Sequence, residues 1–459
     1  MSAMSISPFD TVAAVSTPYG KGGVAVIRIS GEDAVAVATR VFCPMDKSPL
    51  ASHAPRTAVY GHVVDPADGR VLDDCIAILF RAPHSFTGED TVEISCHGGV
   101  LVTRRVLEAC LVAGARQATA GEFTRRAFLS GKLSLERAEA LGNLLDAGSD
   151  EQMKLARAGM SGLLTDRAED IYRDLCAALS NLEAGIDFPE EDLTPLSREQ
   201  IRELALRAHA DLQALVRTWR TGHAIAEGVP TVICGRPNVG KSAFYNRLVG
   251  REAAIVTDVA GTTRDVLTDT VTLGRVTLRL SDTAGLRESD DPVERIGVER
   301  ARRAMEDAEL ILCLTDLSSD PELDTLANTL RAEGKTVLRI LTKSDLGGER
   351  VEGSGADVAV SSLSGAGFDA LAALVEETFI DADLRMGEDA VVFSARQVAA
   401  LRESASALEM AVANLDADLP YDICADDLRA ALHALGTLCG REVTEDVIGE
   451  IFSRFCVGK

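Results

Sequence analysis

The chain has 459 residues, with 47 Lys and Arg against 71 Asp and Glu, and its net charge is −24. A chain of this length exceeds what one hydrophobic core usually organises, so several domains are expected, and the acidic balance argues against a broad electrostatic footprint on nucleic acid. The ten cysteines include no C-x-x-C pair, which argues against both a zinc site and a disulfide framework and fits a reducing compartment.

The first twenty residues contain neither Lys nor Arg, which argues against a secretory signal and against an arginine-rich transit peptide. No apolar run approaches the length of a membrane-spanning helix. Together with the cysteine pattern, these features predict a cytoplasmic protein with no membrane partner.

Residues 1–125 have the pattern of an α+β domain, in which glycine-rich turns separate short apolar stretches. The predicted elements are strands at 24–29, 75–80 and 92–96 and an amphipathic helix at 101–112. Arg28 and Glu93 each interrupt the apolar pattern of a strand. From the residues alone, a cross-strand ion pair is the simpler explanation of both.

Two blocks with helical spacing, 126–226 and 383–459, flank the middle of the chain. In the first block, Leu135, Ala138, Leu141 and Leu145 fall on one helix face, and a second helix follows the acidic segment 187–192. That second helix is predicted to begin with a capping box formed by Ser197 and Gln200 and to run to about Trp219. In the second block, Ser394 starts the helical spacing and Thr444 could cap the last helix. Because domain ends often lie close together, one helical domain with the middle segment inserted is the simplest architecture.

The run Gly235-Arg236-Pro237-Asn238-Val239-Gly240-Lys241-Ser242 has the spacing of a phosphate-binding loop. A buried strand is predicted before it at 232–234, and a helix is predicted after it at 242–248. The loop offers backbone N–H groups and the charge of Lys241 to a phosphate, and Ser242 to a magnesium ion. Alternating strand and helix patterns over 227–382 predict a doubly wound parallel sheet.

Later motifs in the same segment point to GTP. A strand at 276–280 leads to Asp282-Thr283-Ala284-Gly285, whose carboxylate can hold magnesium through water, and Thr263 is a candidate second magnesium ligand. A strand at 337–341 leads to Thr342-Lys343-Ser344-Asp345, where a carboxylate can accept both hydrogen bonds of a guanine edge. Thr342 replaces the usual asparagine, and Leu286 stands where Ras-type enzymes carry the glutamine that orients water.

Motifs along the whole chain carry a family resemblance. The run Asp258 to Asp265, followed by 282–287, resembles the TrmE–Era–EngA branch of translation GTPases. The stretches Thr17-Pro18-Tyr19-Gly20-Lys21-Gly22-Gly23, Ser85-Phe86-Thr87-Gly88-Glu89-Asp90 and Phe455-Cys456-Val457-Gly458-Lys459 resemble the MnmE family, also called TrmE. The resemblance implies four segments: an N-terminal folate-binding and dimerisation domain (1–125), a helical domain (126–226 and 383–459) and an inserted Ras-like α/β G domain (227–382). Cys456 is read as a packed residue or as a reactive one, and packing is the commoner case.

The resemblance also implies residue roles. Asn238, Thr257, Val259 and Thr262 match the positions that hold a stimulating potassium ion, Ser242 and Thr263 match the Mg²⁺ ligands, and Glu294 matches the glutamate that orients the attacking water. Arg28, Glu93, Lys132 and Lys459 match positions that contact a tetrahydrofolate derivative. The residues assigned to GTP are Asn238, Val239, Gly240, Lys241, Ser242, Ala243, Thr257, Asp258, Val259, Ala260, Gly261, Thr262, Thr263, Asp282, Thr283, Ala284, Gly285, Thr342, Lys343, Ser344, Asp345, Ser361, Ser362 and Leu363.

The activity implied by the resemblance is GTP hydrolysis coupled to tRNA modification. A homodimer would act with the flavoprotein MnmG, which carries FAD, and would install a 5-carboxymethylaminomethyl or aminomethyl group on wobble uridine 34. The one-carbon unit would come from 5,10-methylene- or 5-formyl-tetrahydrofolate, and the tRNA would lie mainly on the partner. Two alternatives remain: an RNA or ribosome assembly GTPase without modification chemistry, and a scaffold that holds nucleotide without hydrolysing it.

Overall fold

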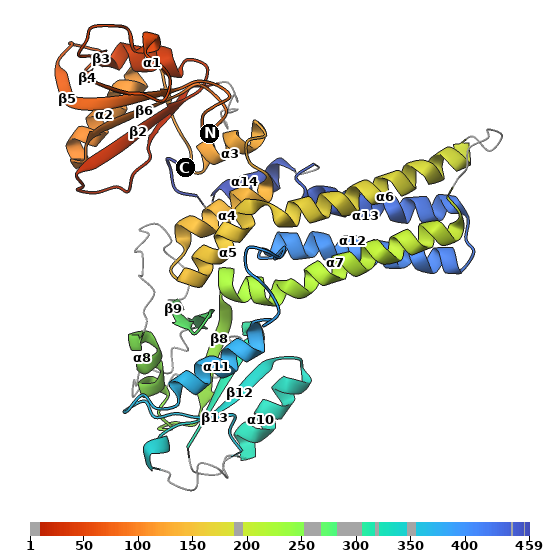
Figure 1. Ribbon diagram of the computed structural model, residues 1–459. Coiled ribbons are helices and arrows are strands. Elements are labelled where there is room, and N and C mark those ends of the chain that lie inside the picture. Colours follow the sequence, from red (N-terminus) through yellow and green to blue (C-terminus); the bar gives the residue numbers. More distant parts are fainter. Residues whose placement is uncertain are drawn as a thin grey trace, which may run out of the picture. The chain divides into compact units, whose positions relative to one another are not determined.

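A computed structural model describes residues 10–187, 196–251, 268–281, 305–316, 321–346, 355–441, 444–453 and 455–459 (Figure 1). The chain divides into two compact units, one formed by Met1–Gly142 with Cys439–Lys459 and the other by Asn143–Leu438. The first unit therefore joins both ends of the sequence. The domain limits expected after residues 125, 226 and 382 stay predictions.

The first unit is built on a seven-stranded sheet. In spatial order its strands are β3 (Phe42–Pro44), β4 (Ala58–Val64), β5 (Val71–Phe80), β6 (Thr91–His97), β2 (Val24–Ser30), β1 (Val12–Val15) and β7 (Arg116–Gln117). Two helices, α1 (Ala34–Val41) and α2 (Val100–Val112), complete its α+β core. The predicted strands at 24–29, 75–80 and 92–96 and the predicted helix at 101–112 are all present, extended by a few residues.

Side-chain alternation decides which face of this sheet is covered. In β2 the side chains of Ala25, Ile27 and Ile29 are buried in the main apolar cluster, whereas Arg28 lies on the opposite face. The helix α2 packs against β1, β2, β5 and β6 and closes the apolar side. A period of two along each strand thus separates the hydrophobic core from the face that carries the charged residues.

The end of the chain packs onto the segment that follows this sheet. The helix α3 (Glu122–Leu129) contacts α14 (Glu445–Ser453), and Ala120 forms an antiparallel bridge with Val457. A small apolar cluster of Ala138, Ile448, Phe452 and Phe455 holds the two segments together. At Gly121 any side chain would collide with the carbonyl oxygen of Phe452, so only glycine permits this approach.

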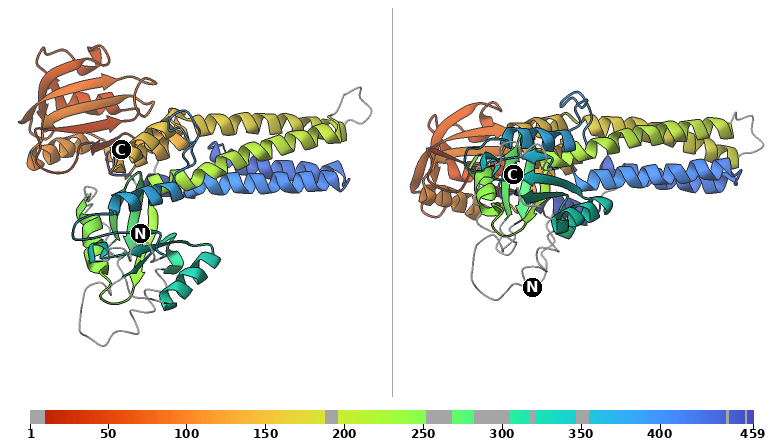
Figure 2. Two further views of the ribbon diagram at one scale, coloured as in Figure 1. Left: turned by 60° about the horizontal axis from the view of Figure 1, so that its bottom comes forward. Right: turned by 90° about the horizontal axis from the view of Figure 1, so that it is seen from below.

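The second unit contains a bundle of long helices, which run side by side in both views of Figure 2. The helices of this part are α4 (Leu135–Asp146), which begins in the first unit, α5 (Asp150–Ser161), α6 (Leu163–Asp187), α7 (Arg198–Ala226), α12 (Ala395–Asp416) and α13 (Tyr421–Leu438). The helix α12 packs against both α7 and α13, and α13 packs against α6. Leu145, which was expected on the apolar face of α4, is exposed.

Capping boxes start two of these helices. The hydroxyl of Ser197 accepts from the Gln200 N–H while the Gln200 side chain accepts from the Ser197 N–H, as predicted. Ser394 and Gln397 repeat the arrangement at α12. The predicted end of α7 at about Trp219 is wrong, because the helix continues to Ala226.

The last turns of α7 continue because the returning chain covers them. The Thr221 hydroxyl donates to the Phe379 carbonyl at 3.1 Å and accepts from the Asp381 N–H at 2.8 Å. At Gly222 a side chain would collide with the carbonyl oxygen of Val392. The end of the inserted segment and the chain after it therefore pack against the last turns of α7, the helix that leads into the insertion.

The inserted segment forms a six-stranded sheet. In spatial order its strands are β13 (Val358–Ala359), β12 (Thr336–Leu341), β11 (Leu310–Thr315), β8 (Val229–Gly235), β10 (Val276–Ser281) and β9 (Thr268–Leu273), with helices α8 (Lys241–Arg251), α10 (Pro321–Ala332) and α11 (Phe368–Phe379). The central strand β11 is buried along its whole length, as a strand covered on both faces requires.

The expectation of a wholly parallel sheet is wrong at one edge. The strand β9 pairs antiparallel with β10 through a tight turn in which Gly274 has φ 64°. Glycine adopts this left-handed conformation without strain. The other neighbouring strands of this sheet pair in parallel.

One aromatic pair marks the junction between α7 and this sheet. The Trp219 ring stacks on the His223 ring with centroids 4.5 Å apart, and His223 Nε2 lies 3.2 Å from a carboxylate oxygen of Glu309. The Glu309 N–H donates to the Pro230 carbonyl at 2.9 Å, so the contact reaches both strands β8 and β11.

The predicted combination of an α+β part, an all-α part and an inserted α/β part is confirmed. In the part of the chain that the structure describes, no helix is both long and apolar enough to cross a membrane.

Candidate functional site

The phosphate-binding loop joins β8 to α8, as the sequence predicts. Gly235 has φ 144° and Gly240 has φ 104°, and a side chain at Gly235 would collide with the Leu314 carbonyl oxygen. Asn238 also adopts a left-handed conformation, with φ 64°. These backbone angles curl the loop ahead of the N-terminal end of α8, where N–H groups and the helix dipole favour an anion.

Lys241 lies against the inside of this loop. Its Nζ donates to the carbonyl oxygens of Gly235 at 2.9 Å and Arg236 at 2.7 Å. Burial lowers the pKa of Lys241. The ammonium group is therefore held by the loop itself, beside the backbone that would surround a phosphate.

The predicted base-binding motif, 342–345, is tied to the loop by its first two residues, Thr342 and Lys343. The Thr342 hydroxyl, which is buried, lies 2.5 Å from the Val239 carbonyl oxygen and 3.0 Å from that of Thr315. Lys343 Nζ donates to the Asn238 carbonyl at 2.7 Å. Threonine at position 342 thus keeps a hydrogen-bonded link between the two motifs although it lacks the usual amide.

The third segment of the predicted guanine site lies beside the second. The Ser344 N–H donates to the Val360 carbonyl at 3.2 Å, which places 342–345 next to 361–363. Ser361 is buried, whereas Leu363 is exposed. All three segments follow the carboxyl ends of parallel strands, which is where ligands bind in open α/β sheets.

Several predicted residues lie outside the described part of the chain. These are Thr257, Asp258, Val259, Ala260, Gly261, Thr262, Thr263, Asp282, Thr283, Ala284, Gly285 and Glu294. The roles assigned to them in potassium and magnesium binding and in water activation stay predictions.

The candidate folate site centres on Arg28 of β2 and Glu93 of β6, which face each other in register. Arg28 Nη2 lies 2.7 Å from Glu93 Oε1, so the ion pair expected from the sequence exists. The Arg28 guanidinium also lies 5.3 Å from the ring centre of Phe86 and 5.5 Å from that of Phe123. Both are cation–π distances, and the guanidinium is thereby fixed in orientation.

The other two predicted folate residues, Lys132 and Lys459, each hydrogen-bond to a backbone group of a neighbouring segment. The Phe123 N–H donates to the Lys459 carbonyl at 3.1 Å, and Lys132 Nζ donates to the Pro83 carbonyl at 3.1 Å. The structure thus brings Arg28 and Glu93 into direct contact and ties Lys459 and Lys132 to neighbouring segments. Cys456 is exposed, so packing, the commoner of the two interpretations, does not apply to it.

Sequence reasoning assigned no role to the aromatic residues at Arg28 or to the ion pair of the segments that carry them. Phe86 and Glu89 belong to the Ser85–Asp90 motif, which was recognised as a pattern without residue roles. Phe123 and Arg126 lie on α3, where their spacing resembles ordinary helix packing. Only the folded chain shows that Phe86 and Phe123 contact Arg28 and that Arg126 pairs with Glu89.

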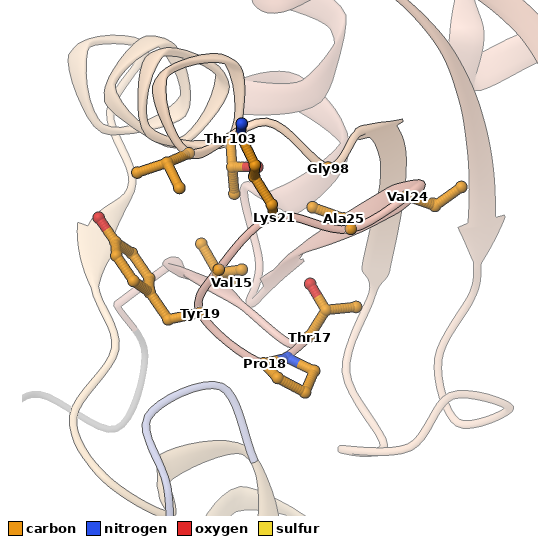
Figure 3. A pocket seen from close by; sticks show the side chains of 12 residues that line it. Val15, Thr17, Pro18, Tyr19, Lys21, Val24, Ala25, Gly98 and Thr103 are labelled. Atoms are coloured by element: carbon orange, nitrogen blue, oxygen red, sulfur yellow. The ribbon is translucent and has the colours of Figure 1, made fainter. Parts of the chain in front are cut away.

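A separate cavity of about 320 Å³ lies where the segment 17–22 meets the start of α2 (Figure 3). Tyr19, Lys21, Val24 and Thr103 are among the residues that line it. None of the four predicted folate residues lines this cavity.

Comparisons with known proteins agree on one family. A model of the MnmE helical domain matches residues 135–456, and a model of the N-terminus of the GTP-binding protein TrmE matches residues 11–132.

Full-length relatives share a common name. The chain is 42% identical to the tRNA modification GTPase MnmE of Symbiobacterium thermophilum, over 98% of this chain and 99% of that protein. It is 39% identical to the protein of the same name from Geobacillus thermodenitrificans, over 99% of this chain and 100% of the relative. Among solved structures, Era of Aquifex aeolicus aligns with 39% of this chain and 65% of its own, at 24% identity and a TM-score of 0.26, which is too low to carry an argument.

Proposed function

The chain belongs to the MnmE family of tRNA modification GTPases, and from that membership we propose that it hydrolyses GTP as part of a tRNA-modifying enzyme. The observation that carries the proposal is the link between the phosphate-binding loop and the base-binding motif. Thr342 and Lys343 bond to the backbone of Val239 and Asn238, so phosphate and base sites form one connected surface.

For the nucleotide, the loop N–H groups and Lys241 hold the phosphates, while Asp345 and the segment 361–363 contact guanine. Ser242 follows Lys241 at the start of α8, and its hydroxyl oxygen is a suitable donor for a hard cation. Ser242 and Thr263 would hold Mg²⁺, which supplies charge neutralisation for the departing phosphate.

We further propose that potassium takes the place of an arginine finger. The ion would be held by Asn238, Thr257, Val259 and Thr262. Ras-type enzymes orient the attacking water with a glutamine at the position of Leu286, and here Glu294 would take over that role. The left-handed conformation of Asn238 supports this assignment, because it turns the loop at that residue.

The first unit would bind a reduced folate. Arg28, Glu93, Lys132 and Lys459 are the proposed contacts, and a carboxylate such as that of Glu93 can accept two hydrogen bonds from a pterin edge. The direct Arg28–Glu93 pair at 2.7 Å supports a preorganised site. The folate would be a 5,10-methylene or 5-formyl derivative that delivers a one-carbon unit.

The modification itself would need a partner. We propose that a homodimer acts with the flavoprotein MnmG, which carries FAD, and modifies wobble uridine 34 of tRNA. The net charge of −24 supports a division in which the tRNA lies mainly on the partner. Hydrolysis of GTP would drive a conformational change transmitted through the helices that flank the insertion.

The decisive experiment measures GTP turnover in potassium and in sodium at matched ionic strength. Faster turnover in potassium is expected, and equal rates would rule out the potassium site. In the same assay Glu294→Ala should still bind GTP and lose most hydrolysis. If hydrolysis persists, another group orients the water.

Isothermal titration with 5-formyl-tetrahydrofolate tests the second site. Binding in the micromolar range or tighter is expected for a site of this kind. An absence of binding would favour an assembly GTPase that performs no modification chemistry.

A further inference from the structure

The segment 83–90, between β5 and β6, is held in place by the helix α3 and the residues just after it. The Ser130 hydroxyl lies 2.6 Å from the Thr87 carbonyl oxygen, and Lys132 Nζ donates to the Pro83 carbonyl at 3.1 Å. At Gly88, which has φ 83°, a side chain would press on Ser130. The segment 83–90 is therefore packed against α3 and the residues just after it, so a contact that restrains one of the two also restrains the position of the other.

Arg126 adds a charged connection between the same two elements. Its side chain is only 6% exposed and joins two carboxylates on different elements. Nη1 lies 3.1 Å from Glu89 Oε1 and 3.2 Å from Glu89 Oε2, while Nη2 lies 2.9 Å from Glu122 Oε1. A guanidinium fork suits this task, because its donors point in fixed directions toward two acceptors at once.

Glu89 extends the connection to β2. Its Oε2 accepts from the Ser30 hydroxyl at 2.8 Å, and Ser30 ends the strand that carries Arg28. The path from Arg126 to this strand thus consists of two consecutive hydrogen bonds in a half-buried region. Bonds to charged groups in such surroundings are stronger and shorter than neutral ones.

The same segment carries Phe86, which contacts Arg28. The guanidinium of Arg28 contacts both the Phe86 ring of the segment and the Phe123 ring of α3, and Phe86 packs against the apolar cluster that contains Phe123. If the segment moved away from α3, Phe86 would leave one side of Arg28 and the guanidinium would gain freedom. The geometry of the Arg28–Glu93 pair depends on the contact between these two elements.

We propose that Arg126 is a positioning residue of the folate site, which holds the segment 83–90 against α3 through Glu89 so that Phe86 and Phe123 fix Arg28. This inference rests on the proposed binding of a reduced folate. Arg126 does not itself contact Arg28 or Glu93 in the contacts described above. Its effect is carried through the carboxylate of Glu89.

The test compares folate affinity in four variants of the full-length chain. Glu89→Gln, Arg126→Gln and the double variant are titrated with 5-formyl-tetrahydrofolate in a calorimeter. Arg105→Gln is the matched control, because it removes one Arg from a surface pair with Glu108 on α2. Each protein is also assayed for GTP turnover and for thermal unfolding.

Both single variants should bind the folate about tenfold more weakly than the unchanged protein, which is the effect of losing one charge-assisted hydrogen bond. The double variant should bind no more weakly than the worse single variant, because both changes break the same connection. GTP turnover should stay unchanged in every variant, since the change lies in the other unit. Arg105→Gln should match the unchanged protein.

Unchanged folate affinity in Glu89→Gln and Arg126→Gln would overturn the inference. Losses that add in the double variant would overturn it as well, because Arg126 would then act by a route other than Glu89. Should Arg126→Gln fail to fold, Glu89→Gln decides alone, since it leaves the Arg126–Glu122 pair intact. If the unchanged protein binds no reduced folate, the proposed folate site itself is wrong.

Discussion

At the scale of single residues, Thr342 shows how an unusual motif residue is accommodated. The family-typical asparagine is absent, yet the Thr342 hydroxyl lies within hydrogen-bond distance of two backbone carbonyls, those of Val239 and Thr315. The residue is buried, so water cannot replace these bonds. We therefore expect the hydroxyl, more than the volume of the side chain, to hold the base-binding motif against the phosphate-binding loop.

Thr342→Val keeps the shape and removes the hydroxyl. The affinity for GTP, measured by calorimetry, should fall about tenfold, because a buried carbonyl loses its donor and the two motifs separate. Thr325→Val, which removes a hydroxyl from the exposed face of α10, serves as the control. Equal GTP affinity in both variants would show that the hydroxyl has no such role.

Glu122 gives the first unit a specific dependence on pH. Burial alone would raise the pKa of Glu122, but hydrogen bonds from Arg116, the Thr119 N–H and Arg126 outweigh it and lower the pKa from 4.5 to about 2. A carboxyl group whose pKa is lowered by folding stabilises the fold above its unfolded value and loses this contribution as the pH falls.

The stabilisation by Glu122 should be complete above about pH 5 and should disappear between there and about pH 2. Glu122→Gln should therefore lower the free energy of unfolding by about 2–3 kcal/mol at pH 7 and by much less near pH 3. Denaturant unfolding, monitored by a signal that reports on the first unit, measures the difference. A constant difference between the two proteins over this range would contradict the assignment.

At the scale of elements, Gly222 and Gly449 are helical glycines whose surroundings differ: one is crowded and the other is open. A Cβ at Gly222 of α7 would collide with the Val392 carbonyl oxygen, whereas at Gly449 of α14 nothing lies within 4 Å. Alanine favours a helix over glycine by about 1 kcal/mol. The space around each glycine, and not its helical conformation, therefore decides whether a Gly→Ala substitution stabilises or destabilises the fold.

Gly222→Ala should lower the stability by about 1–3 kcal/mol because the returning chain must move. Gly449→Ala should raise it by up to about 1 kcal/mol. Urea unfolding of both variants beside the unchanged protein measures the two effects. A stabilising Gly222→Ala would mean that the returning chain does not press on α7.

The elements that sequence could predict are those with a local signal. The phosphate-binding loop and the capping box of Ser197 and Gln200 follow from short spacings, and the strands of the first unit follow from apolar patterns. The end of α7 at Ala226 had no such signal, because contacts with the distant Phe379 and Asp381 extend the helix. The antiparallel edge strand β9 likewise depends on one turn at Gly274.

The residues of the candidate folate site likewise fall into those that a local sequence pattern could identify and those that it could not. Arg28 and Glu93 were identifiable because each breaks a strand pattern, and their pairing was expected. Phe86, Glu89 and Arg126 were not, since each has an ordinary position in its own segment and gains its role from side chains far away in the sequence. Tertiary contacts of this kind leave no periodic pattern.

At the scale of the whole molecule, the inserted segment enters and leaves the helical bundle at one place. The Val392 N–H donates to the Thr218 hydroxyl at 3.0 Å, so the returning chain contacts the last turns of α7, the helix that leads into β8. The helices α7 and α12 pack directly against each other, and α13 packs against α12 and α6. We infer that the bundle does not need the insertion in order to fold.

Replacing residues 227–390 by a short Gly/Ser linker tests this. The shortened protein should keep the helical circular dichroism expected for its bundle and bind reduced folate as tightly as the full chain. It should no longer bind GTP. A shortened protein that is unfolded would show that the insertion and the bundle stabilise each other.

The stacking of Trp219 on His223 has a practical consequence, because the chain contains a single tryptophan. Light absorbed at the red edge of the protein spectrum therefore excites one indole, and that indole lies where α7 meets Glu309 and the nucleotide-binding sheet. An imidazole in contact with an indole can quench its emission, so the emission will depend on the distance between the two rings. A change in this emission on addition of GTP would report a movement at this junction without an attached dye, and His223→Gln, which removes the stacked ring, is the control.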